Sequence, residues 1–172
     1  MTRQDKLVAD VLAAAGGEII GRIRLQKIFY LLDQAGLESG LTYHYHHYGP
    51  FSRDLDEAVG NAQVFEGVHE EVRYRQVDGM PYSVFTVPAR SEADIPPTLG
   101  RLDAGQAREL ITTMKQDSAT VLELAATIHW LAKNERVSDW KAELVRRKGP
   151  KTERGRAEKA VGLLEKLNLH VA

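Results

Sequence analysis

The stretch YHYHHYGPFSRDL, residues 43–55, concentrates three histidines and three tyrosines in six positions, directly before a predicted helix start. Residues 41–48 favour an extended strand, because aromatic and β-branched side chains pack well on a pleated surface. We expect Gly49 and Pro50 to form the turn that follows. Ser52 is a good helix N-cap, and acidic residues come soon after it, where the helix dipole favours them. The stretch has three interpretations: a metal site, a nucleic-acid stacking surface or a packed corner.

Two helices are predicted before this stretch. Apolar residues recur at helical spacing over residues 4–15, and a pair of glycines ends that pattern. A stronger pattern runs from residue 21 to about 35, and its apolar face consists of Leu25, Ile28, Phe29 and Leu32. Its first turns carry basic residues, which the helix dipole disfavours there: Arg22, Arg24 and Lys27. Basic residues at this position most commonly belong to a solvated surface. The alternative interpretation is that they have a functional role.

A β-hairpin and a helical half are predicted after it. Two β-favouring runs flank Asp78-Gly79, which indicates a hairpin over residues 70–88. From residue 103 onward the periodicity is helical, with predicted N-caps at Asp103, Ser118, Ser138 and Thr152. The helix after Ser118 is very apolar and should be the central core element. We therefore expect one compact, mainly α domain spanning residues 1–172, with about six to seven helices and one inserted β-hairpin.

Composition sets broad limits on function. The 172 residues are 43% hydrophobic and 27% charged, with a formal net charge of -1, so no global field attracts DNA or an anionic membrane. The absence of cysteine excludes disulfides, thiolate catalysis and cysteine-based zinc sites. The N-terminal residues resemble neither a signal peptide nor a membrane span. We expect a cytoplasmic protein with no membrane partner.

The histidines are weak candidates for a metal site. His44 and His46 are two residues apart, so on a strand their side chains share a face and could share one ion. A third ligand would have to come from His69, His129 or a carboxylate, and no helical HExxH motif supports one. We expect no metal and no cofactor, and imidazoles that pack and hydrogen-bond beside the tyrosines.

Catalytic motifs are absent from the sequence. No GxSxG nucleophile elbow occurs, and the serines mostly lie at predicted helix caps. The segment GGEIIG, residues 16–21, has neither the lysine of a phosphate-binding loop nor the glycine spacing of a dinucleotide-binding turn. The sequence therefore predicts a protein that is not an enzyme.

A basic stretch near the C-terminus is a second candidate for a functional surface. Residues 141–159 carry eight basic and three acidic residues, an excess of 8 − 3 = 5 positive charges. The candidate patch for nucleic acid or an acidic protein partner is Arg146, Arg147, Lys148, Lys151, Arg154 and Arg156. A basic turn before a capped helix has the outline of a helix-turn-helix. Basic turns between helices are also common, and such a patch suits an acidic protein partner equally well. The net charge of -1 and the absence of Asn and Gln from residues 141–159 favour a protein partner over nucleic acid.

Two motifs resemble those of the YwgA-like and Panacea (SocA-like antitoxin) proteins. The first is Leu-Gln-Lys, two apolar residues, Tyr and two apolar residues, here residues 25–32 with Leu25, Gln26, Lys27 and Tyr30. The second ends an aromatic segment, here Tyr48, Gly49, Pro50, Phe51 and Ser52. The similarity is good over roughly residues 7–60. Taken together with the apolar helix face, it suggests a structural joint in which Tyr48 and Phe51 pack against the helix and Gln26 satisfies free backbone groups of the turn.

The resemblance implies a mostly helical domain that binds proteins. It brings no catalytic residues, and it implies a non-enzymatic regulator of antitoxin or adaptor type, possessing a protein partner such as a cognate toxin. The alternative is a nucleic-acid-binding regulator of winged-helix type, for which the basic stretch would be the contact surface.

Overall fold

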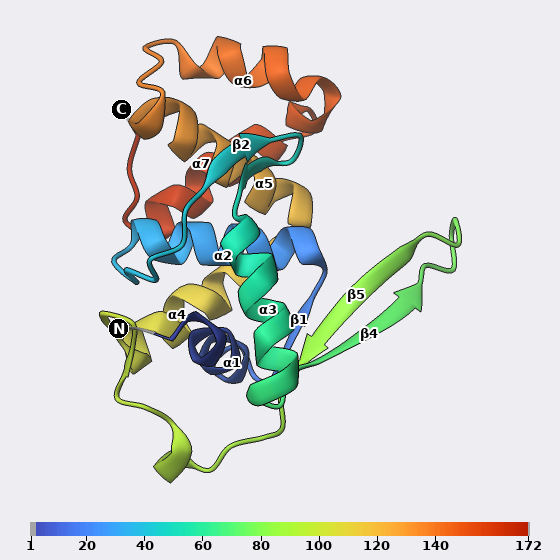
Figure 1. The fold of residues 1–172 in the computed structure, drawn as a ribbon. Coiled ribbons are helices and arrows are strands. Elements are labelled where there is room, and N and C mark those ends of the chain that lie inside the picture. Colours follow the sequence, from blue (N-terminus) through green and yellow to red (C-terminus); the bar gives the residue numbers. More distant parts are fainter. Residues whose placement is uncertain (1–2, 172) are drawn as a thin grey trace.

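The computed structural model describes residues 3–171 and shows a mainly α-helical fold (Figure 1). The described residues form seven α-helices: α1 (Gln4–Ala14), α2 (Arg22–Gln34), α3 (Arg53–Phe65), α4 (Ala104–Lys115), α5 (Ala119–His129), α6 (Trp140–Lys148) and α7 (Arg156–Lys166). Short helical turns add η1 (Glu92–Asp94), η2 (Trp130–Asn134) and η3 (Gly149–Thr152). The prediction of a mainly α fold with about six to seven helices is confirmed.

Helix α5 lies at the centre of the helical body, as its apolar sequence predicted. It packs against α2, α6 and α7, while α1 packs against α3 at the other side of α2 (Figure 1). Val121, Leu124 and Ile128 are fully or almost fully buried. Burying such side chains supplies most of the free energy that holds the helices together.

A three-stranded antiparallel sheet carries the predicted hairpin. Strands β4 (His69–Tyr74) and β5 (Pro81–Thr86) form that hairpin, and β1 (Glu18–Ile20) pairs with the other edge of β5. The sequence did not reveal β1, because three residues are too few for a periodic pattern. The outer part of the hairpin projects from the helical body, so the side chains from residue 71 to residue 81 are all exposed (Figure 1).

The aromatic stretch forms a smaller hairpin whose turn is not where the sequence placed it. Strand β2 (His44–His46) pairs with β3 (Gly49–Phe51), with Tyr45 opposite Pro50. The expected turn at Gly49 and Pro50 was wrong, because the turn residues are His47 and Tyr48. Proline is tolerated in β3 because this short edge strand does not need its missing N–H. A separate pair of short antiparallel strands consists of β6 (Thr98–Leu99) and β7 (Leu102–Asp103).

Side-chain caps begin most of the helices. Ser52, Asp103 and Ser118 each accept a hydrogen bond from the backbone N–H three residues further on, as predicted. The predicted cap at Ser138 was wrong by one residue, because Asp139 caps α6. A carboxylate is at least as good a cap as a hydroxyl, so the sequence alone did not choose between these neighbours.

The last helix starts later than expected. Thr152 does not cap it, because the Thr152 hydroxyl instead donates to the Gly149 carbonyl and closes the turn η3. Helix α7 begins after Gly155, which has the left-handed backbone conformation. The break that the sequence placed at Gly149 and Pro150 is therefore a structured 3-10 turn.

Two side chains of α2 hold the backbone of the Gly-Pro corner. The Gln26 side-chain amide donates to the Ser52 carbonyl and accepts from the Ser52 N–H, both at 2.9 Å. The Lys27 ammonium donates to the Pro50 carbonyl at 2.6 Å. Gln26 is 3% exposed and Lys27 is 1% exposed, so these bonds lie in the core. Gln26 thus has the role that the sequence assigned to it.

The aromatic residues of the corner contribute less than expected. Tyr48 does not pack against α2: it is 45% exposed, beside the His47 ring and beneath the Lys151 ammonium. Phe51 is half-buried, with its ring centroid 5.0 Å from that of His46. Buried hydrogen bonds, more than aromatic packing, therefore fix the joint.

Gly49 lets β3 approach α5 closely. Its φ is +90°, and an added Cβ would lie 2.7 Å from the Thr127 Oγ1. Any residue with a Cβ would crowd Thr127 at this position, and it would also be strained at this positive φ.

Replacing Gln26 by Ala should lower the free energy of unfolding by about 2–4 kcal/mol, because the buried N–H and C=O of Ser52 lose their partners. Urea denaturation followed by circular dichroism measures the change. Gln34→Ala, at the exposed end of the same helix, is the matched control and should stay within about 0.5 kcal/mol of wild type. Equal effects at both positions would contradict the role of the joint.

Replacing Gly49 by Ala should destabilise the protein more than replacing Gly79, whose φ is also positive but which has nothing within 4 Å of an added Cβ. Gly79→Ala should cost about 1–2 kcal/mol for its backbone conformation alone. Gly49→Ala should cost about 1–3 kcal/mol more, because of the contact with Thr127. Thermal and urea melts measure both losses of stability. Adding Thr127→Ala should recover part of the stability lost in Gly49→Ala and none of the stability lost in Gly79→Ala. No recovery in the double variant would refute the proposed clash.

Candidate functional site: a groove between helix α2 and the β4–β5 hairpin

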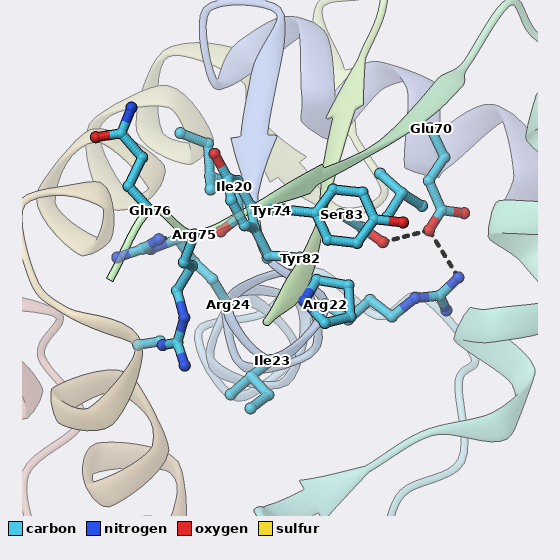
Figure 2. Close-up of a pocket in the computed structure, with 14 residues that line it drawn as sticks. Ile20, Arg22, Ile23, Arg24, Glu70, Tyr74, Arg75, Gln76, Tyr82 and Ser83 are labelled. Atoms are coloured by element: carbon cyan, nitrogen blue, oxygen red, sulfur yellow. Dashed lines mark hydrogen bonds and ion pairs between the residues drawn. The ribbon is translucent and has the colours of Figure 1, made fainter. Parts of the chain in front are cut away.

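An open groove of about 1000 Å³ lies where the start of α2 meets the projecting hairpin (Figure 2). We call it the α2–hairpin groove. Its lining comprises Ile20, Gly21, Arg22, Ile23, Arg24, Glu70, Val72, Tyr74, Arg75, Gln76, Pro81, Tyr82, Ser83 and Ala119. Three arginines, two tyrosines and one carboxylate therefore line the groove. Such a mixture suits a ligand that has both anionic and planar apolar parts.

The N-terminus of α2 opens into this groove. Gly21 is the N-cap and offers no side-chain cap, and no acidic residue lies in the first turn. The first N–H groups of a helix have no acceptor within the helix, and the dipole makes that end partly positive. Arg22, Ile23 and Arg24 therefore present backbone donors at a positive helix end, an arrangement that favours bound anions.

An ordered polar cluster forms one side of the groove, as the dashed lines in Figure 2 show. The Glu70 carboxylate accepts from the Arg22 guanidinium at 2.8 Å and from the Ser83 hydroxyl at 2.5 Å. Burial raises the pKa of Glu70, but the Ser83 hydrogen bond and the Arg22 charge outweigh it and lower the pKa below its ordinary value. Glu70 is therefore ionised at neutral pH.

The other two arginines differ in their freedom. Arg24 donates to the carbonyls of Ile20 and Asp117, and its Nε is enclosed without a partner among the described residues. Burial lowers the pKa of its guanidinium. Arg75 is exposed and pairs with Asp78 at the hairpin tip. Arg24 is thus fixed in the wall, whereas Arg75 can turn toward a ligand.

Most side chains of the predicted basic patch pair with other residues of the same chain. Arg147 bonds to both Glu135 and Glu143 and stacks over the Tyr45 ring, with its guanidinium carbon 4.8 Å from the ring centroid. Arg146 also pairs with Glu143. These pairs neutralise much of the excess that the sequence suggested, so the stretch does not form a free cationic surface.

Two lysines of the same stretch, buried Lys148 and partly exposed Lys151, meet at one buried carboxylate. Lys148 and Lys151 contact Glu123 of α5 at 2.9 Å and 3.1 Å, and Glu123 is 2% exposed. Burial also lowers the pKa of nearby Lys27 to about 8, with Glu123 acting in the opposite direction. These ammonium groups tie α6, η3 and the β2–β3 hairpin to α5.

The remaining members of the patch play separate parts. Arg156 donates to the carbonyls of Pro150 and Lys151 and so holds the turn η3. Arg154 is exposed and makes no hydrogen bond or ion pair to any residue in the range 3–171. Arg154 is therefore the member of the predicted patch that stays free for a partner.

The histidine cluster is not brought together with further ligands. His44 and His46 are exposed on β2, and His47 lies at the turn. Within residues 3–171, no group of three or more histidine or carboxylate side chains could hold a metal ion.

Tyr30, from the first sequence motif, contacts a buried histidine. Its hydroxyl lies 3.1 Å from the Nδ1 of His129 at the end of α5. Burial raises the pKa of the Tyr30 hydroxyl. His129 is 7% exposed, and burial together with the Lys133 charge lowers its pKa from 6.5 to about 4. His129 is thus neutral at physiological pH.

Sequence reasoning largely missed the α2–hairpin groove. The one sign of it in the sequence was the unfavourable position of Arg22 and Arg24 at the start of α2, which we interpreted as solvated surface. Lys27, the third residue of that misfit, is instead buried in the joint. The adjacent carboxylates Glu70 and Glu71 were interpreted from the sequence as a solvated hairpin edge, because the contact of Glu70 with Ser83 depends on strand pairing.

Comparison with known proteins changes the functional interpretation. No family model matches the chain. The chain is 28% identical over 131 residues to a DNA ADP-ribosyl glycohydrolase from Thermus aquaticus, covering 75% of this chain. It spans only about a third (35%) of the length of that relative.

This similarity contradicts two predictions from the sequence. The chain was expected not to be an enzyme and to act as a non-enzymatic antitoxin or adaptor, whereas the relative is named as a glycohydrolase. The prediction rested on the absence of short catalytic motifs, and glycosidases as a class have no such motif, because they generally use a pair of carboxylates that the fold brings together.

None of the helices in the described part of the chain has the length and apolar character needed to cross a membrane. The longest, α2 and α3, have 13 residues each.

Acidification should destabilise the protein through His129. Its folded pKa lies below the unfolded value, so the unfolded chain binds the proton first and stability falls from about pH 6.5 to pH 4. Between pH 7 and pH 5 this loss should be about 2 kcal/mol, and His129→Gln should lack it. Urea titrations of both proteins at each pH measure the difference. Equal pH dependence in the two proteins would contradict a buried neutral His129.

Proposed function

We propose that this chain acts in the hydrolysis of ADP-ribosyl groups from DNA, and that the α2–hairpin groove binds a phosphate-bearing part of the substrate. The observation that carries the proposal is the groove itself, in which an uncapped helix N-terminus meets three arginines and two tyrosines. The similarity to a DNA ADP-ribosyl glycohydrolase supports the choice of substrate.

The chemistry of the substrate matches that of the groove. An ADP-ribosyl group carries a pyrophosphate and an adenine, and DNA adds its own phosphates. Backbone N–H groups of α2 and the guanidinium groups of Arg22 and Arg75 suit phosphate oxygens. The rings of Tyr74 and Tyr82 suit a stacked base. The volume of about 1000 Å³ is at the upper end for small-molecule sites and accommodates a ligand of this size.

Glu70 is the residue best placed to affect the reaction. Water adds to the anomeric carbon while the bond from that carbon to DNA breaks, which releases ADP-ribose and DNA. Positive charge develops on the sugar during this step, and an ionised carboxylate stabilises it. Glycoside hydrolysis generally uses a pair of carboxylates, and the groove lining contains one. We therefore assign the groove to substrate binding and Glu70 to charge stabilisation.

We further propose that the chain is related to YwgA-like and Panacea domains. The support is that the two motifs behind this resemblance touch, since Gln26 and Lys27 of the first bond to Ser52 and Pro50 of the second. A cytoplasmic location is part of the proposal, because DNA is the substrate.

A protein partner is a second candidate. The outer part of the hairpin exposes large apolar side chains, among them Val72, Val77 and Met80, and such exposure on a projecting element favours contact with another protein.

The test measures binding of a short DNA oligonucleotide that carries one ADP-ribosyl group, with the unmodified oligonucleotide as reference. Fluorescence anisotropy should show tighter binding of the modified DNA by about tenfold or more. Arg22→Ala should remove about tenfold of that affinity, because a charge-assisted phosphate contact is lost. Arg73→Ala, on the same hairpin but outside the groove, should bind as wild type does.

Release of free ADP-ribose, followed by mass spectrometry, is the second readout. Glu70→Gln should slow release by at least about tenfold, whereas Glu71→Gln should not. Glu71 is the neighbouring carboxylate and is exposed on the hairpin. Equal affinity for modified and unmodified DNA, or modified DNA bound equally by wild type and Arg22→Ala, would refute the proposal.

A further inference from the structure

A second, smaller pocket lies at the opposite end of α2. Its volume is about 320 Å³, and its lining consists of Tyr30, Gln34, Tyr43, His129, Trp130, Lys133 and Asn134. We call it the π-turn pocket, because three of these residues belong to the π-helical turn η2. The lining combines two tyrosines and a tryptophan with a histidine, a lysine and two side-chain amides, and it contains no carboxylate.

The walls of the π-turn pocket are held in place by contacts behind it. The Tyr30 ring meets the Tyr43 ring edge-on, with centroids 5.1 Å apart. The Tyr43 hydroxyl donates to Asp33 at 2.7 Å, and the Trp130 Nε1 donates to Glu135 at 2.9 Å. Rings fixed in this way lose little freedom when a ligand binds against them.

The π-helical turn itself points to a ligand. It inserts one residue more per turn than an α-helix, a costly arrangement that occurs frequently at functional sites. The Glu135 N–H bonds to the Trp130 carbonyl at 3.0 Å, which closes the wide turn. This geometry places Trp130, Lys133 and Asn134 around one opening.

Polar groups at the pocket lack partners in the protein. Gln34, Lys133 and Asn134 make no hydrogen bond or ion pair to any residue of the described chain. His129 is more than nine-tenths buried, and its ring makes one hydrogen bond, to Tyr30, among residues 3–171. Its second ring nitrogen and the two side-chain amides therefore remain available to a ligand.

We propose that the π-turn pocket binds a purine nucleotide, with the base against the half-buried Trp130 and Tyr43 rings and the phosphate at Lys133. Amide side chains are suited to bidentate bonds with an adenine edge, and aromatic rings stack on any base. A volume of about 320 Å³ corresponds to a small ligand rather than a long chain. The absence of a lining carboxylate suits an anion.

The pocket does not depend on the groove or on the function proposed for it. The two sites lie at opposite ends of a helix of 13 residues, which corresponds to about 20 Å. The shared ligand chemistry could come from a free nucleotide or from a base in a nucleic-acid strand.

Calorimetric titration with adenosine monophosphate tests the proposal. We expect binding that Asn134→Ala and Trp130→Ala each weaken at least about tenfold. Asn134 is exposed, so its variant stays informative even where loss of the half-buried Trp130 impairs folding. Lys133→Ala should weaken the monophosphate but not adenosine, whereas Lys141→Ala, an exposed lysine of α6, should change neither. Arg22→Ala should also have no effect, which separates this pocket from the groove.

Two further ligands identify the source and the base. A short oligo(dA) strand that binds more tightly than the monophosphate assigns the pocket to a base in a strand, and the reverse assigns it to a free nucleotide. Cytidine monophosphate should bind at least about tenfold more weakly. Equal binding of the two monophosphates, no binding at millimolar concentration, or affinity unchanged by both Asn134→Ala and Trp130→Ala would overturn the proposal.

Discussion

The pair of hydrogen bonds between the Gln26 side-chain amide and the Ser52 backbone is the contact on which the rest of the structure depends. It closes a link between α2 and the start of α3 inside the core, where an unpaired backbone group is costly. Because Ser52 also caps α3, the same link fixes where that helix begins. The Lys27 bond to the Pro50 carbonyl extends the link to β3.

Charge in this protein is used mainly to hold elements together. Glu123 of α5 attracts Lys148 and Lys151, and Arg147 joins η2 to α6 through Glu135. The Lys148–Glu123 pair is buried, and breaking such a pair leaves an uncompensated charge, so each of these two partners is needed once the other is present. A local excess of basic residues in a sequence therefore does not by itself indicate a surface for nucleic acid.

Helix α2 organises both sites through its two ends. Its uncapped N-terminus opens into the α2–hairpin groove, whereas Tyr30 and Gln34 near its C-terminus line the π-turn pocket. The middle of the helix is buried in the joint and the core, so only its two ends can contact a ligand under these proposals.

The sequence by itself determined the helices, the β4–β5 hairpin and most caps, because these follow from local periodicity and from side chains that bond to nearby backbone. It also indicated the role of Gln26. It misplaced the β2–β3 turn and put Tyr48 in the core, because either register of a short aromatic segment satisfies the same local preferences. Only the tertiary structure decided that Glu70 and Ser83 meet Arg22, that Lys148 is buried against Glu123, and that η2 shapes a pocket. The hydrogen bonds and the ion pair among these contacts join residues from 13 to 48 positions apart, and such contacts depend on how the elements pack rather than on any pattern within one of them.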